Sequence, residues 1–315
     1  MTDQDLKSKF IGTLYGLSLG DAIGSFFEGL GSVTPEQILK CIEQNRVLRY
    51  TDDTEMTIGV AESLVKSKGV HIEDMVKTFI RNFDPSRGYG WGTMTIINLW
   101  RKGEDWREVS KRMFGGAGSF GNGAAMRVAP LALMFYDRTE KLRCVVEEAS
   151  RITHAHPLGI EGAILQAFSI ALSIKVKTRV EVDPKWFLEN LQYEAKSEVF
   201  RVKIEAIHRL LDLQPSKNEL RSKLGCGVES YNSVPAAIYF ALKYGSDYRT
   251  AVLNAVSLGG DTDTIGSMTG AIVGAHLGLD AIPTEWVSKL ENAPYIRELA
   301  EKLLEIKIGM IKGLE

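Results

Sequence analysis

Two rows of glycine, each repeating at every fourth residue, constrain the fold of this chain more than any other sequence feature. The rows are Gly12, Gly16, Gly20 and Gly24, and Gly266, Gly270, Gly274 and Gly278. Each row costs on the order of 2–4 kcal/mol relative to alanine unless packing compensates for it. Because a glycine face lets helix backbones approach closely, we predict two buried helices that pack tightly on neighbours and could pack on each other. The pairs Gly20-Asp21 and Gly24-Ser25 keep open the alternative that some of these glycines are helix ends or loop positions.

Helical periodicity dominates the rest of the sequence. Apolar residues recur with helical spacing in segments 55–66, 131–136, 144–152, 160–174, 186–193, 199–211, 234–244 and 295–308. The best strand candidate, residues 176–182, is charged and isolated. We therefore predict an all-α fold with residues 1–315 in one domain. The charge-rich segment 175–224 could be a lobe or an insertion.

The composition is that of a globular protein, with 44% hydrophobic and 25% charged residues and a net charge of −2. These values exclude wholesale disorder and do not indicate nucleic-acid or membrane binding. Three scattered cysteines fit neither a disulfide framework nor a zinc site. The polar N-terminus is unlike a signal peptide. The longest apolar stretch, 158–174, is interrupted by Glu161 and Gln166, so we judge it too short and too polar to span a bilayer. We expect a soluble, cytoplasmic monomer.

Two acidic clusters are the sharpest chemical signal. They are Thr51-Asp52-Asp53-Thr54 and Asp261-Thr262-Asp263-Thr264, each placed just before a predicted helix. Helix capping explains one such cluster, since Asp and Thr are good N-caps. Capping needs one side chain and not four, however, and adjacent carboxylates repel each other. If the fold brings the clusters together, their four carboxylates can hold two divalent ions, as in a two-metal hydrolytic site.

Two glycine-rich segments could form walls of a binding site. Residues 115–123 contain five glycines in nine residues, whose backbone N–H groups could bind phosphate oxygens. A flexible surface loop is the alternative. Arg127, in the apolar run that follows, needs a carboxylate or carbonyl partner. Residues 87–92 alternate glycine with aromatic side chains and could either flank a ring or form a tight turn.

Three further side chains are weaker candidates. His154 and His156 at a helix end do not share one helical face, so each taken alone is best explained as a structural histidine. Glu28 follows Phe26-Phe27 and is an acid in an apolar setting. Such a carboxyl group is either partnered or has a raised pKa.

Five motifs in order resemble those of the ADP-ribosylglycohydrolase family, over about residues 8 to 280. They are Gly20-Asp21-Ala22-Ile23-Gly24 leading to Glu28, Tyr50-Thr51-Asp52-Asp53-Thr54, Gly121-Asn122-Gly123 with Met126-Arg127, Thr153-His154, and Gly259-Gly260-Asp261-Thr262-Asp263-Thr264. No single motif is specific, but their joint occurrence is. The resemblance implies a compact, orthogonal all-α bundle with a dinuclear centre of two Mg²⁺ (or Mn²⁺) in a cleft. It also implies hydrolysis at C1″ of ADP-ribose conjugates.

The resemblance also assigns roles to individual positions. The implied metal ligands are Thr51, Asp52, Asp53, Asp261, Asp263 and Thr264. The implied substrate contacts are Gly90, Phe114, Gly118, Ser119, Phe120, Gly121, Asn122 and His154. Glu28 and Asp261 are the candidate general acids, and Glu28 corresponds to a mobile glutamate of the family.

The substrate is expected to be an ADP-ribosylated protein or an ADP-ribose ester. The loop motifs are more similar to the branch that acts on serine-linked ADP-ribose, poly(ADP-ribose) and O-acetyl-ADP-ribose. Two alternatives stay open at this point. One is an arginine-linked ADP-ribosyl hydrolase, and the other is a non-catalytic ADP-ribose-binding or structural relative. The intact acidic clusters argue against the last of these, because their repulsion would destabilise an empty site.

Overall fold

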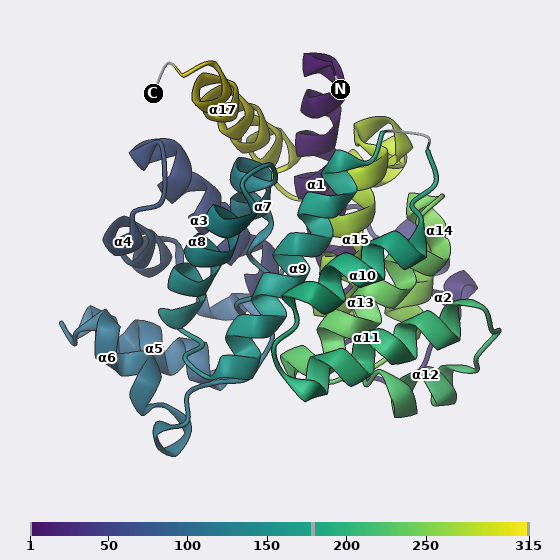
Figure 1. The fold of residues 1–315 in the computed structure, drawn as a ribbon, viewed down its shortest axis with the longest axis horizontal. Helices are drawn as coiled ribbons and strands as arrows, with labels where there is room; N and C mark the ends of the chain where they lie inside the picture. Colours follow the sequence, from purple (N-terminus) through teal and green to yellow (C-terminus); the bar gives the residue numbers. More distant parts are fainter. Residues whose placement is uncertain (1, 178–179, 314–315) are drawn as a thin grey trace.

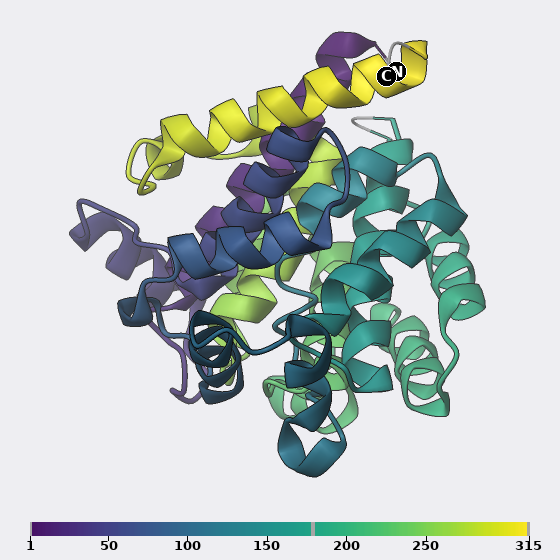
Figure 2. The same ribbon diagram turned by 90° about the vertical axis from the view of Figure 1, so that its left-hand side faces the viewer.

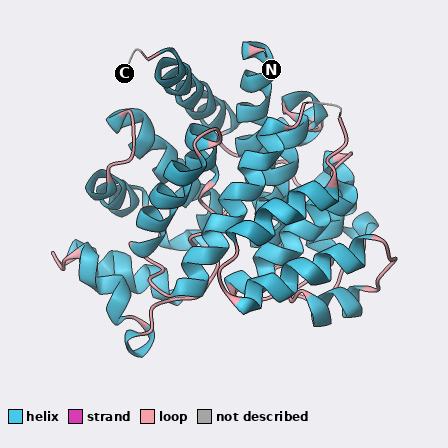
Figure 3. Cartoon of the chain, viewed as in Figure 1, coloured by secondary structure: helices cyan, strands magenta, loops and turns pink. Residues whose placement is uncertain are grey.

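A computed structural model describes residues 2–177 and 180–313 (Figure 1). Within these ranges the chain forms 17 α-helices and three short 3₁₀ helices joined by loops, and no strand (Figure 3). The elements are α1 (Asp3–Gly24), α2 (Pro35–Gln44), α3 (Asp52–Ser67), α4 (Ile72–Asn82), η1 (Pro85–Arg87), α5 (Trp91–Arg101), α6 (Trp106–Arg112), η2 (Phe114–Gly116), α7 (Ala129–Phe135), α8 (Thr139–Arg151), α9 (Pro157–Lys175), α10 (Pro184–Glu194), α11 (Glu198–Leu211), α12 (Lys217–Lys223), α13 (Ser230–Tyr244), α14 (Tyr248–Ser257), α15 (Thr262–Leu277), η3 (Leu279–Ala281), α16 (Thr284–Val287) and α17 (Ala293–Lys312). The prediction of an all-α fold is confirmed.

The two glycine rows pack on each other, antiparallel, at the centre of the molecule. A Cβ atom placed on Gly16 would lie 2.3 Å from the Gly270 carbonyl oxygen, and one on Gly20 would lie 2.1 Å from that of Gly266. No side chain fits in that space, so the contact is backbone against backbone. The predicted pair of buried helices is therefore confirmed. Gly24 is the last residue of α1, and Gly278 lies just past the end of α15 with φ 78°.

The other helices surround this central pair and cross it at varied angles. Helices α9, α13 and α14 pack against α15, whereas α3, α7 and α17 pack against α1. Figure 2 shows α17 lying across the N-terminal half of α1. One contiguous hydrophobic core runs through these contacts, and all eight segments with helical periodicity lie in helices or their caps.

Helix α9 requires a correction to the sequence argument. The helix has 19 residues and is apolar enough, by length and composition, to cross a membrane, so the argument from length and polarity does not hold. Burial decides instead, since 89% of its most apolar window lies inside the protein. A central core helix has this property because neighbours cover its whole circumference.

The segment 175–224 forms α10, α11 and α12. Phe187, Leu191 and Phe200 are completely buried there, and α10 and α11 pack on α9 and α13. The strand candidate at 176–182 includes residues 178 and 179, which lie outside the described residues. Its remaining residues form no strand.

Candidate active site

The central glycine contact determines which helix ends meet. Because α1 and α15 run antiparallel, the end of α1 lies beside the start of α15, where the Thr262 hydroxyl donates to the Gly24 carbonyl over 2.8 Å. Asp21, in the last turn of α1, is fully buried and accepts hydrogen bonds from Thr51 and Thr54. The starts of α3 and α15 therefore converge on the end of α1, and each carries one acidic cluster.

Capping accounts for only a small part of these clusters. Thr51 caps α3 by accepting from the Asp53 backbone N–H over 3.3 Å. Asp261 occupies the N-cap position of α15, yet its side chain makes no capping hydrogen bond. In the first turn of α15, Asp263 Oδ1 accepts from the Thr264 backbone N–H over 2.8 Å. One such bond does not require four carboxylates, although both helix N-termini favour negative charge there.

The clusters face each other across a cavity of about 300 Å³. The predicted site residues that line it are Glu28, Asp52, Asp53, Gly90, Phe114, Ser119, Gly121, Asn122, His154, Asp261, Asp263 and Thr264. Three predicted site residues do not line it: Thr51, Gly118 and Phe120. The Thr51 hydroxyl donates to Asp21 over 2.7 Å instead, and Phe120 is exposed beside Tyr231 and His156.

Contacts between the acids close the site. The Thr264 hydroxyl donates to Asp53 Oδ1 over 3.4 Å and so joins the two clusters. Carboxylate oxygens of Glu28, Asp261 and Asp263 lie within 4.8 Å of one another, which is close enough to share a metal ion. Asn122 donates from its side-chain amide to Asp261 and links the glycine-rich loop to the acidic group.

The electrostatics of the cavity fit a divalent cation. Burial raises the pKa of the four cluster aspartates, and repulsion from neighbouring carboxylates raises it further for Asp52, Asp53 and Asp263. Among the described residues that line the cavity there is no lysine or arginine to compensate this charge. The Oδ2 atom of Asp53 is buried without a hydrogen-bond partner. A buried, unpaired carboxylate oxygen among hydroxyls and further carboxylates is the donor set of a hard cation such as Mg²⁺ or Mn²⁺.

Glu28 occupies the open side of this acidic group. Burial and then the charge of Asp261 raise the pKa of Glu28. It lies in the turn after α1 and is partly exposed. The backbone of the same turn is held to the second cluster, because the Gly29 N–H donates to the Gly260 carbonyl over 3.0 Å.

The glycine-rich loop forms the opposite wall. Gly115, Gly116 and Gly118 all have positive φ, which favours glycine, and Phe114 adopts φ 53° beside them. The loop is tied to the start of α13, since the Asn122 N–H donates to the Val228 carbonyl over 2.9 Å. Phe114 is exposed and meets Trp91 edge to face at 5.9 Å, so two aromatic rings stand at the mouth of the cavity.

His154 lines the cavity as a neutral ring. Burial, and then the charge of Arg127, lowers the pKa of His154 to about 3. Its Nδ1 atom lies 2.8 Å from the Thr153 hydroxyl. The predicted need of Arg127 for a partner is confirmed, because its guanidinium donates to the carbonyl oxygens of Gly123 and Ala149 and to Thr153.

Asp21 lies within the motif at residues 20–24, but the sequence alone indicated no structural or catalytic role for it. Burial raises its pKa to about 6, while four hydrogen bonds from Thr51 and Thr54 act in the opposite direction. Those bonds fix the first turn of α3 and therefore the position of Asp52 and Asp53. The available signal was an aspartate within the glycine-rich, largely apolar part of the helix, residues 10–24, where a carboxylate needs donors from elsewhere in the fold.

Comparisons with known proteins identify the family of this chain. The sequence model of the ADP-ribosylglycohydrolase family matches residues 2–310. The chain belongs to the ADP-ribosylglycohydrolase family. As a member it is a glycohydrolase enzyme, which removes the alternative of a non-catalytic relative.

Two curated relatives and one solved structure give the degree of similarity. The ADP-ribosylhydrolase ARH3 of Homo sapiens is 34% identical, over 94% of this chain and 93% of its own length. The ADP-ribosyl-[dinitrogen reductase] glycohydrolase of Rhodospirillum rubrum is 27% identical, over 92% and 93%. A structure titled ADP-ribosylglycohydrolase-related protein complex has a TM-score of 0.74 at 23% identity, covering 96% of this chain and 99% of its own, which shows the shared fold.

The raised pKa values of the cluster predict how stability depends on pH when no divalent ion is present. In EDTA the folded protein binds more protons than the unfolded chain between the usual aspartate pKa near 4 and the raised values. The free energy of unfolding should therefore fall as pH rises from about 5 to about 8. Adding Mn²⁺ should reverse much of this loss. Urea denaturation at both pH values, with EDTA and with Mn²⁺, measures the effect, and the same unfolding free energy at both pH values in EDTA would contradict it.

Proposed function

We propose that this glycohydrolase is metal-dependent and hydrolyses the C1″ bond of ADP-ribose conjugates. The observation that carries the proposal is the meeting of both acidic clusters and Glu28 in one cavity, where Asp53 Oδ2 is buried and unpaired. The proposed substrates are serine-linked ADP-ribosyl protein, O-acetyl-ADP-ribose and poly(ADP-ribose). This choice is supported by the loop motifs and by the similarity to ARH3 over nearly the whole chain.

Two Mg²⁺ or Mn²⁺ ions would be held by the carboxylates of Asp52, Asp53, Asp261 and Asp263, with a hydroxyl oxygen from Thr264. Thr51, which does not line the cavity in this structure, would add the oxygen of a hydroxyl whose proton it donates to Asp21. When bound, such ions polarise a water molecule and orient hydroxyl groups of a substrate. The protein contributes a fixed set of oxygen ligands, because Asp21 and Asn122 hold the two clusters in place. It also provides a largely buried surrounding, in which these charges interact more strongly than in water.

The walls of the cavity suit the rest of ADP-ribose. In the loop 115–122 the backbone N–H groups of Gly116, Ala117, Gly118, Gly121 and Asn122 already donate within the protein, so Ser119 and Phe120 are positions whose N–H groups can turn toward a diphosphate. Neutral His154 can hydrogen-bond to the diphosphate without adding charge. Phe114 at the mouth offers a ring face for stacking. We include Gly90, Gly118, Ser119, Phe120, Gly121 and Asn122 in the proposed substrate-binding set.

Breaking the bond to a serine oxygen requires a proton, since an alkoxide is a poor leaving group. The transition state resembles an oxocarbenium ion, as in other glycoside hydrolysis. Glu28 and Asp261 are the two carboxyl groups placed to supply or relay that proton. Glu28 is partly exposed, whereas Asp261 is buried and bonded to Asn122.

Substitutions separate these two candidates when Mn²⁺ affinity is measured beside turnover, because Asp261 is also a proposed metal ligand and its loss could act through the metal. Glu28→Gln and Asp261→Asn each keep side-chain size and remove the titratable proton. We expect the variant of the true proton donor to lose about 10²–10⁴-fold in kcat on serine-linked substrate. The loss should be smaller on a substrate whose leaving group departs without protonation. Full turnover in both variants would contradict the assignment.

The deciding experiment for the function is ADP-ribose release from a serine-ADP-ribosylated peptide, measured with Mg²⁺ and with EDTA. Release that requires Mg²⁺ supports the metal, the bond and the branch together. Release that persists in EDTA would overturn the metal dependence. If neither condition gives release, the same assay with an arginine-linked substrate tests the second candidate function, which the similarity to the Rhodospirillum rubrum enzyme supports.

A further inference from the structure

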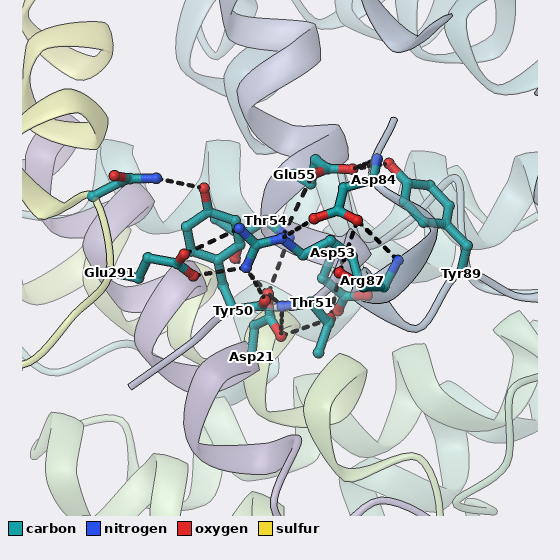
Figure 4. Close-up of polar contacts among 12 residues, drawn as sticks. Asp21, Tyr50, Thr51, Asp53, Thr54, Glu55, Asp84, Arg87, Tyr89 and Glu291 are labelled. Atoms are coloured by element: carbon teal, nitrogen blue, oxygen red, sulfur yellow. Dashed lines mark hydrogen bonds and ion pairs between the residues drawn. The ribbon is translucent and has the colours of Figure 1, made fainter. Parts of the chain in front are cut away.

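A partly buried network of charges, centred on Arg87, lies beside the first turn of α3 (Figure 4). The guanidinium donates to both carboxylate oxygens of Glu291, at 2.7 and 3.1 Å, and to the Tyr50 carbonyl at 2.9 Å. Its carbon lies 4.3 Å from the centre of the Tyr50 ring. Only 11% of the side chain is exposed. A planar guanidinium can make this bidentate and stacked contact, and a lysine cannot.

The network is not part of the acidic group. Arg87 does not line the cavity, and the carboxylates nearest its Nε atom belong to Glu55 at 3.6 Å and Asp84 at 3.7 Å. Arg87 is therefore not a counter-ion of the cluster aspartates. Burying such charges carries a desolvation cost that a well-packed apolar group would avoid. A contribution to stability therefore does not explain well why the protein has this network. The fixed geometry that the network imposes on nearby segments explains it better.

On the cavity side, Arg87 holds two segments that form the walls. The Tyr50 carbonyl belongs to the residue directly before Thr51, where the first acidic cluster begins. Gly88 directly follows Arg87 in the chain, and a Cβ atom placed on it would lie 3.9 Å from Asp52 Oδ1. One guanidinium therefore sets the distance between the start of α3 and the wall at 88–90.

Glu55 adds a second link between the same two segments. It lies one turn after Asp52 on α3 and accepts from the Asp84 N–H over 3.0 Å and from the Tyr89 hydroxyl over 2.7 Å. Tyr89 is buried and is the next residue after Gly88. The segment 84–89 is thus fastened to the first turn of α3 on both sides of Arg87.

The far end of the network is anchored in the loop before α17. Glu291 is linked to Tyr50 by Arg87, which donates to both residues. The Asn292 side-chain amide donates directly to the Tyr50 hydroxyl over 2.9 Å. The same loop pairs with Leu48 through the Glu291 N–H, which donates to the Leu48 carbonyl over 3.0 Å. The network therefore ties the cavity walls to the start of α17, a helix that carries none of the proposed catalytic groups.

We propose that Arg87 and Glu291 are positioning residues for the active site. They hold the start of α3 and the wall at 88–90 at the separation that binding of divalent ions and ADP-ribose requires. Their effect on metal binding and turnover rests on the proposed function, whereas their effect on the local backbone does not. The experiment below reads the two effects separately.

The test variants are Glu291→Gln and Arg87→Lys, which weaken the bidentate contact without emptying the space. The matched control is Glu62→Gln. Glu62 also lies on α3 and also joins neighbouring elements, because it accepts from Arg81 over 2.6 Å, from Asn82 over 2.7 Å and from the Tyr295 hydroxyl. It stands about 15 Å further along the helix than Asp52, given a rise of 1.5 Å per residue.

Two measurements are made on each protein. Hydrogen exchange in EDTA reports the backbone N–H groups of Thr51 and Thr54, which donate to Asp21, and that of Asp84, which donates to Glu55. Electron paramagnetic resonance of free Mn²⁺ gives the metal affinity. We expect both test variants to exchange faster at these positions and to bind Mn²⁺ about tenfold more weakly, as when a group that orients metal ligands is lost. The control should keep wild-type exchange at these positions and wild-type Mn²⁺ affinity.

Unchanged exchange in both test variants would overturn the proposal, and so would faster exchange with unchanged Mn²⁺ affinity. Equal losses in Glu62→Gln would also overturn it, since they would indicate general destabilisation. If the wild-type protein binds no Mn²⁺, the metal dependence proposed above is wrong. The exchange result then decides the positioning role alone.

Discussion

Replacing Gly270 with leucine should destabilise the protein by at least about 3 kcal/mol, the upper part of the range for overpacked cores. A Cβ atom at this position would lie 2.0 Å from the Gly16 carbonyl oxygen, which is backbone and cannot rotate away. The two central helices would have to separate. Urea denaturation compared with wild type measures the loss.

The same substitution at Gly69 is the control. No heavy atom lies within 4 Å of a Cβ atom there, and its φ is not in the left-handed region. Gly69→Leu should therefore change the unfolding free energy by no more than about 0.5 kcal/mol, as for other surface substitutions. Wild-type stability in Gly270→Leu would show that the glycine contact does not hold the helices together.

Asp263→Ala should abolish divalent-ion binding and reduce turnover at least about a hundredfold, since losing even a group that only orients the metal ligands costs about 10- to 100-fold. The folded protein should persist. Burial, followed by repulsion from Asp261, raises the pKa of Asp263, so in EDTA its removal relieves an unfavourable charge. We expect the variant to melt in EDTA at the wild-type temperature or above. Isothermal titration with Mn²⁺ and thermal denaturation in EDTA give the two readouts.

Asp74→Ala is the control for an aspartate outside the cavity. Asp74 forms an ion pair with Lys66 and lies in the first turn of α4. Its loss should lower stability slightly and leave Mn²⁺ affinity unchanged. Full activity with metal still bound in Asp263→Ala would refute the ligand assignment, whereas loss of the fold would show that the carboxylate is structural.

The sequence predicted the elements of the site better than their connections. It predicted the glycine-striped helices, the acidic clusters and the need of Arg127 for a partner, because each is a local pattern with one dominant physical cause. It gave no role to Asp21, and it did not connect Arg87 with Glu291. Those contacts join residues far apart in the chain, and nothing local identifies the partner.

Packing showed which cluster atoms capping leaves unused. The Asp261 side chain makes no capping bond and Asp53 Oδ2 has no partner, so capping alone does not explain the clusters. Packing also explains why α9 is apolar over a membrane-spanning length: 89% of its most apolar window is covered by neighbouring parts of the protein. Burial and partners are properties of the fold and cannot be obtained from composition.

By itself the sequence determined that the chain is helical, that two of its helices must pack closely on neighbours, and that two sets of carboxylates stand at helix starts. Periodicity, the cost of glycine and capping preferences act within a few residues, so they can be read from the sequence. Only the tertiary structure decided that the antiparallel contact of α1 and α15 brings the end of α1 to the starts of α3 and α15. Asp21 is then placed to hold one acidic cluster opposite the other. The physical reason is that backbone contact between glycines fixes the relative position of two helices along their axes, and that position sets which distant residues share a cavity.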